Sequence, residues 1–183
     1  RAAADAQYPK CLEDHPTEPL VVQESVSFYD RTARSDRATE ILEAALEQDP
    51  TSRFRVPLAR RMKNMGRLEE SERLFREEAE VNPSPDAWFL LGDHYVRRDM
   101  LSEAVEAFRE AVEVAPNPPP MIVFAHADTL IQAGRLDEAR KAAEELEGTP
   151  LDDLIEGRIL AAEGKWEKAL ATFAKGILLW PNN

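Results

Sequence analysis

Apolar residues recur along most of the chain at the three- and four-residue spacing of an amphipathic helix. Val22, Val26 and Tyr29 follow this spacing near one end of the sequence. Leu170 and Phe173 continue the same pattern near the other end. From about residue 19 onward, the pattern therefore predicts a succession of helices that each bury one face.

Glycines and prolines divide these helices into pairs. A glycine stands where a helix end favours a left-handed residue, in Asn64-Met65-Gly66, Ala133-Gly134 and Glu163-Gly164. A proline closes each second helix, because it cannot donate a hydrogen bond into a continuing helix. These prolines are Pro50, Pro83, Pro116, Pro150 and Pro181. The predicted helical hairpins cover about residues 20–50, 53–83, 86–116, 120–149 and 151–181.

One pattern of small and aromatic residues recurs in the hairpins. Its clearest copy is Trp88-x-x-Leu91-Gly92-x-x-Tyr95, followed by Ala104, Phe108, Ala111 and Pro116. The small residue of the second helix recurs at spacings of 33, 33, 35 and 30, as Ala38, Ser71, Ala104, Ala139 and Ala169. A period of this length is typical of a solenoid, in which each unit buries its apolar face on its neighbours.

These residues resemble the tetratricopeptide repeat (TPR), and the resemblance covers roughly 165 of the 183 residues. The fourth hairpin departs most from the pattern, with Ala143 where a phenylalanine is usual, and its second helix is expected to be shortened, ending near Gly148. The resemblance implies an all-α fold, an α-α superhelix of about five hairpins. It also implies a non-catalytic protein–protein interaction scaffold, whose first helices line a concave groove.

The groove positions that the resemblance implies are partly aromatic and partly charged. We expect Phe89 and Phe124 to anchor an apolar side chain of the partner, and Asp93 and Asp128 to hold a basic one. The full set of expected partner-binding residues is Phe89, Asp93, Arg97, Phe124, Asp128, Arg60, Lys63, Asn64 and Arg158. The alternative is that the two aromatic residues pack on neighbouring hairpins and the two acids are merely solvated.

Residues 1–18 look different from the remainder, which is assigned to a TPR domain over residues 19–183. Ala2–Ala4 can begin a short helix, but Pro9, Pro16 and Pro19 argue against a long one. We interpret this segment as a leader or linker that packs loosely on the first repeat.

Charge and composition restrict the classes of partner. The net charge is −12, which disfavours nucleic acid and anionic membrane surfaces and favours a basic or partly basic protein or peptide partner, although acidic helix surfaces usually serve solubility alone. No run of about 18 apolar residues predicts insertion into a bilayer. The lone cysteine, Cys11, leaves both the cytoplasm and the periplasm open.

Candidate chemistry is sparse. No cysteine or third histidine stands at ligand spacing from His94 and His126, so we expect no metal site and no cofactor. No nucleophile–base pair or phosphate-binding glycine loop predicts an enzyme. Cys11 and His15 have the spacing of a haem attachment motif that lacks its second cysteine, and an ordinary linker is the favoured interpretation.

The last hairpin leaves apolar residues with no following helix to cover them, among them Ile177, Leu178 and Trp180. A solenoid needs a polar cap at each end. Two explanations stay open, a chain cut from a longer protein and self-association through this end. The alternative functions are accordingly a TPR arm of a larger enzyme or electron-transfer protein, and a homo-oligomeric assembly module.

Overall fold

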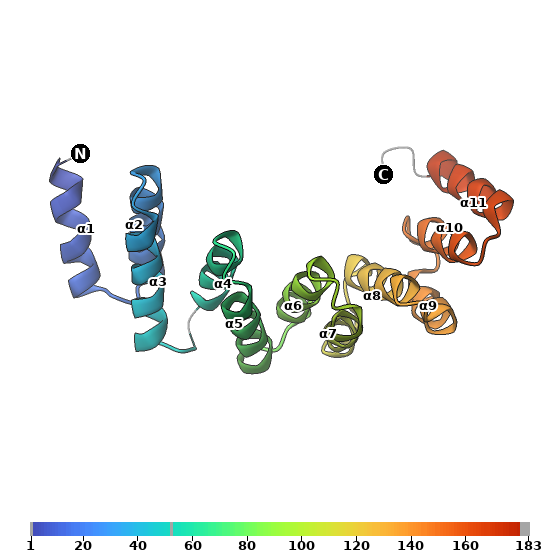
Figure 1. Ribbon diagram of the computed structural model, residues 1–183, viewed down its shortest axis with the longest axis horizontal. Coiled ribbons are helices and arrows are strands. Elements are labelled where there is room, and N and C mark those ends of the chain that lie inside the picture. The colour runs from blue at the N-terminus through green and yellow to red at the C-terminus, as the bar shows by residue number, and fades with distance from the viewer. Residues whose placement is uncertain (1, 52, 180–183) are drawn as a thin grey trace. The chain divides into compact units, whose positions relative to one another are not determined.

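The computed structural model describes residues 2–51 and 53–179, and the regular structure of this part of the chain is entirely helical (Figure 1). It comprises eleven α-helices and one short 3₁₀ helix. The predicted all-α fold is therefore confirmed. By its internal contacts the chain divides into two compact units, residues 1–82 and 83–183. Trp180 and Pro181, which were expected to end the last hairpin, lie outside the described residues.

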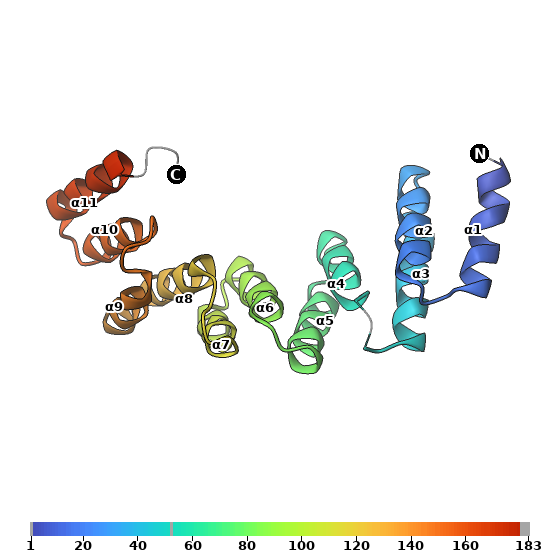
Figure 2. The same cartoon turned by 180° about the vertical axis from the view of Figure 1, so that it is seen from behind.

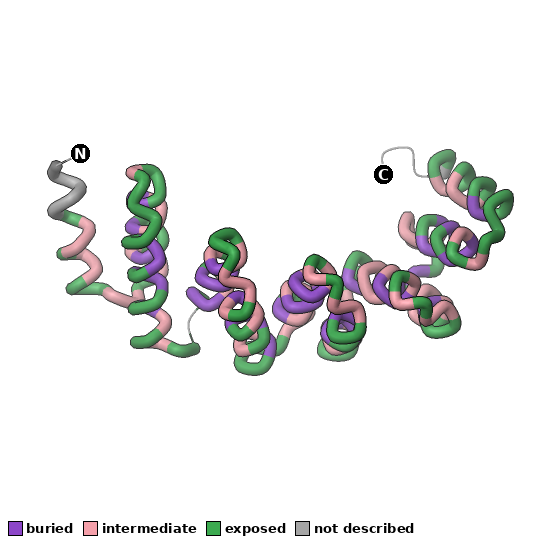
Figure 3. The backbone as a smooth tube through the Cα atoms, in the orientation of Figure 1, coloured by how far each residue is buried: buried purple, intermediate pink, exposed green. Residues whose placement is uncertain are grey.

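The first unit holds a single helix followed by two helical hairpins, α2–α3 and α4–α5. Its helices are α1 (Ala2–Asp14), α2 (Pro19–Arg31), α3 (Ser35–Gln48), α4 (Arg55–Asn64) and α5 (Leu68–Val81). Burial follows the apolar period of the sequence. On α3, for example, the buried apolar side chains are Ala38, Ile41, Leu42 and Ala45, which fall on one face of the helix. Buried and exposed positions alternate along the helices in this way (Figure 3).

The second unit holds three hairpins, α6–α7, α8–α9 and α10–α11. Its helices are α6 (Pro85–Arg97), α7 (Leu101–Glu113), α8 (Pro120–Gln132), α9 (Leu136–Ala143), α10 (Asp152–Ala162) and α11 (Trp166–Leu179). A core cluster joins successive hairpins, because it contains Val105 of α7, Leu130 of α8 and Ile159 of α10. Burial between neighbouring hairpins is what a repeat architecture requires.

The turn inside each hairpin has the same construction. A residue with positive φ follows the first helix, and these residues are Ala33, Gly66, Asp99, Gly134 and Gly164. The next amide donates a hydrogen bond of 2.8–3.0 Å to the carbonyl five residues earlier, the Schellman arrangement. The left-handed glycines expected at 66, 134 and 164 are confirmed. Ala33 and Asp99 adopt the same conformation at φ 59° and 60°, without the steric freedom of glycine.

The fourth hairpin has a shortened second helix, as its sequence indicates. Helix α9 has only 8 residues and ends at Ala143, earlier than the expected end near Gly148. A 3₁₀ helix, Glu144–Leu146, continues it and places Leu146 fully in the core.

The expectation that Pro9 would prevent a long N-terminal helix is wrong. Helix α1 runs for 13 residues with Pro9 inside it. Its ribbon is continuous in both views (Figures 1 and 2). Proline removes one hydrogen bond of the helix, but packing can compensate for this loss. The ring of Tyr8 stacks on Phe28 of α2 with centroids 4.6 Å apart, and α1 lies against the first hairpin.

Helix α1 also carries the residue pattern of a second helix. Ala104, Phe108, Ala111 and Pro116 define that pattern in the third hairpin. The same offsets in the first segment give Ala4, Tyr8, Cys11 and Pro16. We infer that α1 takes the place of a second helix of the repeat rather than that of a loosely packed leader.

Candidate functional site: the first-helix face and the grooves between second helices

The first helices of the second unit form a continuous row. Helix α8 packs against both α6 and α10, so these three helices are neighbours in the second unit (Figure 1). We call the side chains of Phe89, Asp93, Arg97, Phe124, Asp128 and Arg158 on these helices the first-helix face. Six of the nine expected partner-binding residues therefore lie on neighbouring helices of one unit.

The two aromatic residues of this face are half-buried. The ring of Phe89 lies 5.5 Å from the ring of Phe108, centroid to centroid, at a tilt of 54°. Phe124 packs against the core cluster of the second unit. Phe89 thus packs on the second helix of its own hairpin, Phe124 packs on the core cluster, and both keep part of their surface accessible.

The first acid of the face is paired within its own helix. Arg97 donates a hydrogen bond of 2.9 Å from Nε to Oδ2 of Asp93, one turn away. This hydrogen bond raises the pKa of Arg97 above its ordinary value. The Asp93 side chain is 31% exposed and that of Arg97 is 66% exposed, so water screens the pair.

The second acid is paired between helices. Arg158 of α10 places Nε 2.5 Å from Oδ1 of Asp128 on α8. Gln132 donates a hydrogen bond of 2.9 Å to the other carboxylate oxygen. Because the Asp128 side chain is only 16% exposed, this contact ties α8 to α10 more than it offers a charge to a partner.

The remaining expected residues, Arg60, Lys63 and Asn64, lie on α4 in the first unit. Arg60 and Asn64 are exposed and Lys63 is half-buried. They form a short basic and polar stretch on a first helix, but they belong to a different unit from the aromatic residues.

Sequence reasoning missed two arginines that hold the first unit together. Arg55 is 4% exposed, and it donates to Glu78 at 2.7 Å and to the Pro50 carbonyl. The sequence contains a signal that Arg55 is buried, because Arg55 stands three, four and seven residues before Leu58, Ala59 and Met62. These apolar residues form the buried face of α4. A buried arginine in such a series requires a carboxylate from another helix.

Arg61 is the second such residue. It pairs with Asp30 of α2 and donates to the Thr39 hydroxyl of α3 at 2.8 Å. It therefore joins the α4–α5 hairpin to the α2–α3 hairpin. The sequence offers no comparable signal for this role, since Arg60 and Arg61 are adjacent arginines and only the fold shows which of them faces the neighbouring hairpin.

Grooves of similar construction lie between successive second helices. Their volumes are about 430 Å³ between α1 and α3, about 360 Å³ between α3 and α5, and about 390 Å³ between α7 and α9. Each groove is lined by residues that stand five, eight and nine positions after the small residue of its first-named helix. These residues are Pro9, Leu12 and Glu13 on α1, Glu43, Leu46 and Glu47 on α3, and Arg109, Val112 and Glu113 on α7. This correspondence supports the assignment of α1 as a second helix.

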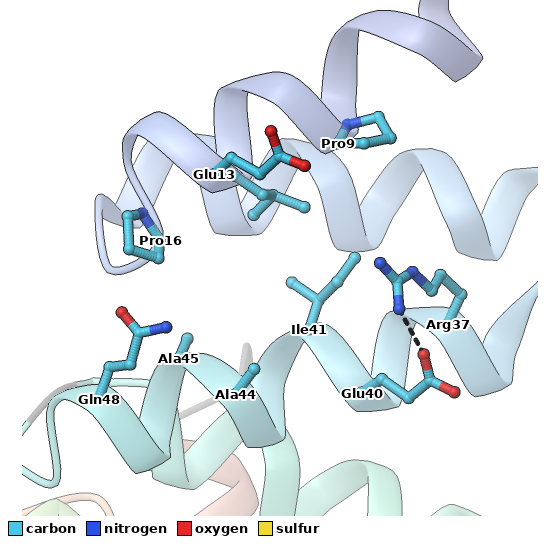
Figure 4. A pocket seen from close by; sticks show the side chains of 10 residues that line it. Pro9, Glu13, Pro16, Arg37, Glu40, Ile41, Ala44, Ala45 and Gln48 are labelled. Carbon is cyan, nitrogen blue, oxygen red and sulfur yellow. Dashed lines mark hydrogen bonds and ion pairs between the residues drawn. The ribbon is translucent and has the colours of Figure 1, made fainter.

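The groove between α1 and α3 is the least charged of the three. Pro9 and Pro16 line one wall, while Ile41 and Ala44 lie on the other (Figure 4). Where α3 carries Ala44, the equivalent position of α5 carries Glu77, and the 3₁₀ helix after α9 carries Glu145 at the same offset. Arg37 and Glu40 form an ion pair of 2.6 Å at the edge of this groove (Figure 4).

The described part of the chain offers little for other chemistry. Over residues 2–51 and 53–179, no three His, Cys, Asp or Glu side chains come together in a way that could hold a metal ion. In the same residues, no helix has the length and apolar character needed to span a bilayer.

Comparisons with known proteins agree with this architecture. Residues 56–119 and residues 120–145 each match a family profile described as a tetratricopeptide repeat. Among curated proteins, none matches the chain in sequence.

Several solved structures are similar over most of the chain. YrrB, described as a TPR protein with an unusual peptide-binding site, matches with a TM-score of 0.69 and 20% identity, over 97% of this chain and 94% of that one. MamA matches with a TM-score of 0.71 and 16% identity, over 92% of this chain and 93% of that one. The Pseudomonas aeruginosa protein pilF matches with a TM-score of 0.65 and 17% identity, over 100% of this chain and 85% of that one.

At these identities the likeness to solved structures shows the fold alone, and the family profiles identify the repeats within it. The structure supports the assignment to the tetratricopeptide repeat as well. It has the helical hairpins, their common turn and the recurring small residues of such a repeat. The chain is a tetratricopeptide repeat protein with the solenoid fold of that family.

Proposed function

We propose that this chain is a non-catalytic scaffold that binds a peptide or helix of a partner protein on the first-helix face. The observation that supports the proposal is the row of adjacent first helices, because two half-buried aromatic rings and two arginine–aspartate pairs lie on these neighbouring helices. The repeat fold indicates protein–protein interaction, and the similar structure YrrB is described as having a peptide-binding site.

The aromatic residues supply the apolar part of the contact. A partner side chain that covers the accessible edges of Phe89 and Phe124 removes apolar surface from water on both sides. Because both rings already pack within the protein, little side-chain entropy is lost when the partner binds.

The charged residues of the face differ in what they offer. A basic partner side chain can replace Arg97 at Asp93 with little penalty, because an exposed ion pair contributes little in water. Replacing Arg158 at Asp128 is harder, since that carboxylate is mostly buried and also accepts from Gln132. Asp93 is therefore the residue that we assign to a basic partner side chain, and Asp128 positions Arg158.

For the first unit, taken by itself, we propose Arg60, Lys63 and Asn64 as a separate contact with a partner. They occupy a first helix, and Arg60 and Asn64 are exposed, so we assign this stretch contacts with carbonyl or carboxylate oxygens. Their contribution is expected to weaken as salt concentration rises, because exposed charges are screened.

A charge swap tests the proposal without removing an ion pair. The double variant Asp93→Arg/Arg97→Asp keeps oppositely charged side chains one turn apart while it exchanges their places on the face. A partner captured from native lysate is identified by mass spectrometry, purified, and titrated calorimetrically against each variant. We expect at least a tenfold loss of affinity in this swap.

The matched control is Arg37→Glu/Glu40→Arg, which exchanges an exposed pair on the second helix α3. This control should bind the partner with the affinity of the wild type. Equal affinities for all three proteins would show that the first-helix face is not the binding surface.

A further inference from the structure

Helix α11 exposes an unusually large apolar surface. Leu170, Ile177 and Leu178 are 68%, 69% and 82% exposed, and Trp166 at the start of the helix is 65% exposed. Ala171 and Ala174 lie exposed among them. We call the side chains of Leu170, Ala171, Ala174, Ile177 and Leu178 the α11 face. The opposite side of the helix packs on α10, where Phe173 fits against Gly157.

The equivalent positions of α7 show what covers such a surface. Leu170 and Ile177 correspond to Val105 and Val112, counted from Ala169 and Ala104. Val105 is only 1% exposed, because it shares the core cluster with Val123, Ala127 and Leu130 of α8, and Val112 packs on the same cluster. Within this unit, therefore, an amphipathic helix covers the positions that α11 leaves open.

The outer positions of α11 differ from those of the other long second helices. Glu106, Arg109 and Glu113 of α7 are charged, and so are the corresponding residues Glu40, Glu43 and Glu47 of α3 and Arg73, Arg76 and Glu80 of α5. On α11 these three positions hold Ala171, Ala174 and Leu178. Charges that keep the outer side of a second helix in water are thus replaced by apolar side chains, which widens the apolar surface.

We propose that the α11 face docks an amphipathic helix of a partner protein, with apolar side chains spaced as Val123, Ala127 and Leu130 are on α8. The absence of charge at the outer positions of α11 favours a partner helix with a broad apolar face and no acidic residue within it. This surface is distinct from the first-helix face, so one chain can hold two partner segments.

A second copy of this chain fits the α11 face less well. A helix of 14 residues is about 21 Å long, so its stripe suits a single docked helix but falls well short of the roughly 800 Å² per partner that a stable homodimer usually buries. Two copies also bring together net charges of −12 each, which oppose association. A partner helix that is not acidic meets no such repulsion.

A helical peptide provides a direct test. The probe is a fluorescein-labelled peptide with the sequence of residues 119–133, which includes the α8 stripe and is held helical by a hydrocarbon staple on its opposite side. Fluorescence anisotropy measures its binding to the full chain, and amide shifts in ¹⁵N NMR spectra locate the contact. We expect saturable binding that shifts the amides of α11.

Three variants distinguish the α11 face from other surfaces. Leu170→Asp/Ile177→Asp should weaken peptide binding at least tenfold, and circular dichroism checks that the helices persist. Leu20→Asp/Met121→Asp changes apolar residues that are 65% and 57% exposed elsewhere, and it should bind as the wild type does. The Asp93→Arg/Arg97→Asp swap should also bind the peptide unchanged, which separates this result from the test of the first-helix face.

Two kinds of result would overturn the proposal. One is peptide binding that is undetectable at millimolar concentration or unaffected by Leu170→Asp/Ile177→Asp. The other is a concentration-dependent dimer in analytical ultracentrifugation that the same variant abolishes, since a second copy would then be the occupant.

Discussion

At the scale of single residues, two glycines set how closely the helices of a hairpin approach. A Cβ atom on Gly92 would lie 2.6 Å from Cε1 of Phe108, closer than any normal packing contact. Gly157 meets Phe173 in the same way. In the recurring pattern Gly92 and Phe108 stand on the two helices of one hairpin, and the phenylalanine ring fills the space beside the glycine.

Gly92→Ala should therefore destabilise the protein by about 1–3 kcal/mol, because the added methyl group overpacks the hairpin. Urea titration followed by circular dichroism measures the change. In a double-mutant cycle, Phe108→Leu should cost less in the Gly92→Ala background than in the wild type, since the smaller side chain relieves the contact. Strictly additive effects would mean that the two residues do not meet.

His126 is a residue whose environment predicts a pH dependence. Burial lowers the pKa of His126, and the positive charges of Arg109 and Arg135 lower it further. The folded protein thus binds the proton more weakly than the unfolded chain does, and protonation favours unfolding. This contribution to stability is complete above the unfolded pKa, about 6.5, and is lost as the pH falls below it.

His126→Gln should remove this part of the pH dependence. We expect the free energy of unfolding of the wild type to fall more steeply than that of the variant between about pH 7 and pH 5. Urea titrations at several pH values provide the comparison. Parallel curves for the two proteins would contradict the assigned environment of His126.

At the scale of elements, the sequence was most informative where the helix period and the turn residues agreed. Gly66, Gly134 and Gly164 mark three of the five turns, because only glycine adopts positive φ without strain. Ala33 and Asp99 occupy the equivalent turns with no glycine to signal them. Their conformation follows from the packing of the two helices that they connect, which no local pattern records.

The length of helix α1 was predicted wrongly, because the helix-breaking effect of Pro9 was given more weight than the repeat pattern of the segment. Pro9 argues against a long helix when its neighbours are considered alone. Ala4, Tyr8 and Cys11 carry the second-helix pattern, and their offsets were available in the sequence. The stack of Tyr8 on Phe28 shows that tertiary packing supports the helix through its proline.

The packing of α1 predicts the effect of removing its aromatic contact. Tyr8→Ala should destabilise the first unit by about 1 kcal/mol, as expected for the loss of a stacked aromatic pair. Hydrogen exchange of the α2 amides reports the change locally. Lys10→Ala alters an exposed side chain of the same helix and should leave this exchange as in the wild type. Unchanged α2 protection in Tyr8→Ala would show that α1 does not support the first hairpin.

At the scale of the whole molecule, the family and the repeat architecture could be predicted from the sequence, while the pairing of charges could not. The positions of Phe89, Asp93, Phe124 and Asp128 on first helices follow from the period alone. The contact between Asp128 and Arg158 joins residues of successive hairpins. It forms because the packing of α8 on α10 brings the two side chains together, and the helix period does not record that packing.

The division into two units predicts how the chain behaves when it is cut. The second unit contains its own core, with Leu146, Ile155 and Ile159 fully buried. In repeat proteins stability is the sum of terms within units and between neighbours, so a fragment of whole hairpins should fold. Residues 83–183 should therefore show helical circular dichroism and one cooperative urea transition.

Residues 100–183 make the matched control, because they retain α7 but lack α6, so that Phe108 loses its contact with Gly92. This shorter fragment should unfold at a clearly lower urea concentration, since an exposed stacking face replaces the α6–α7 contact. Equal midpoints for the two fragments, or an unfolded 83–183 fragment, would contradict the assignment of whole hairpins as the stable units of this solenoid.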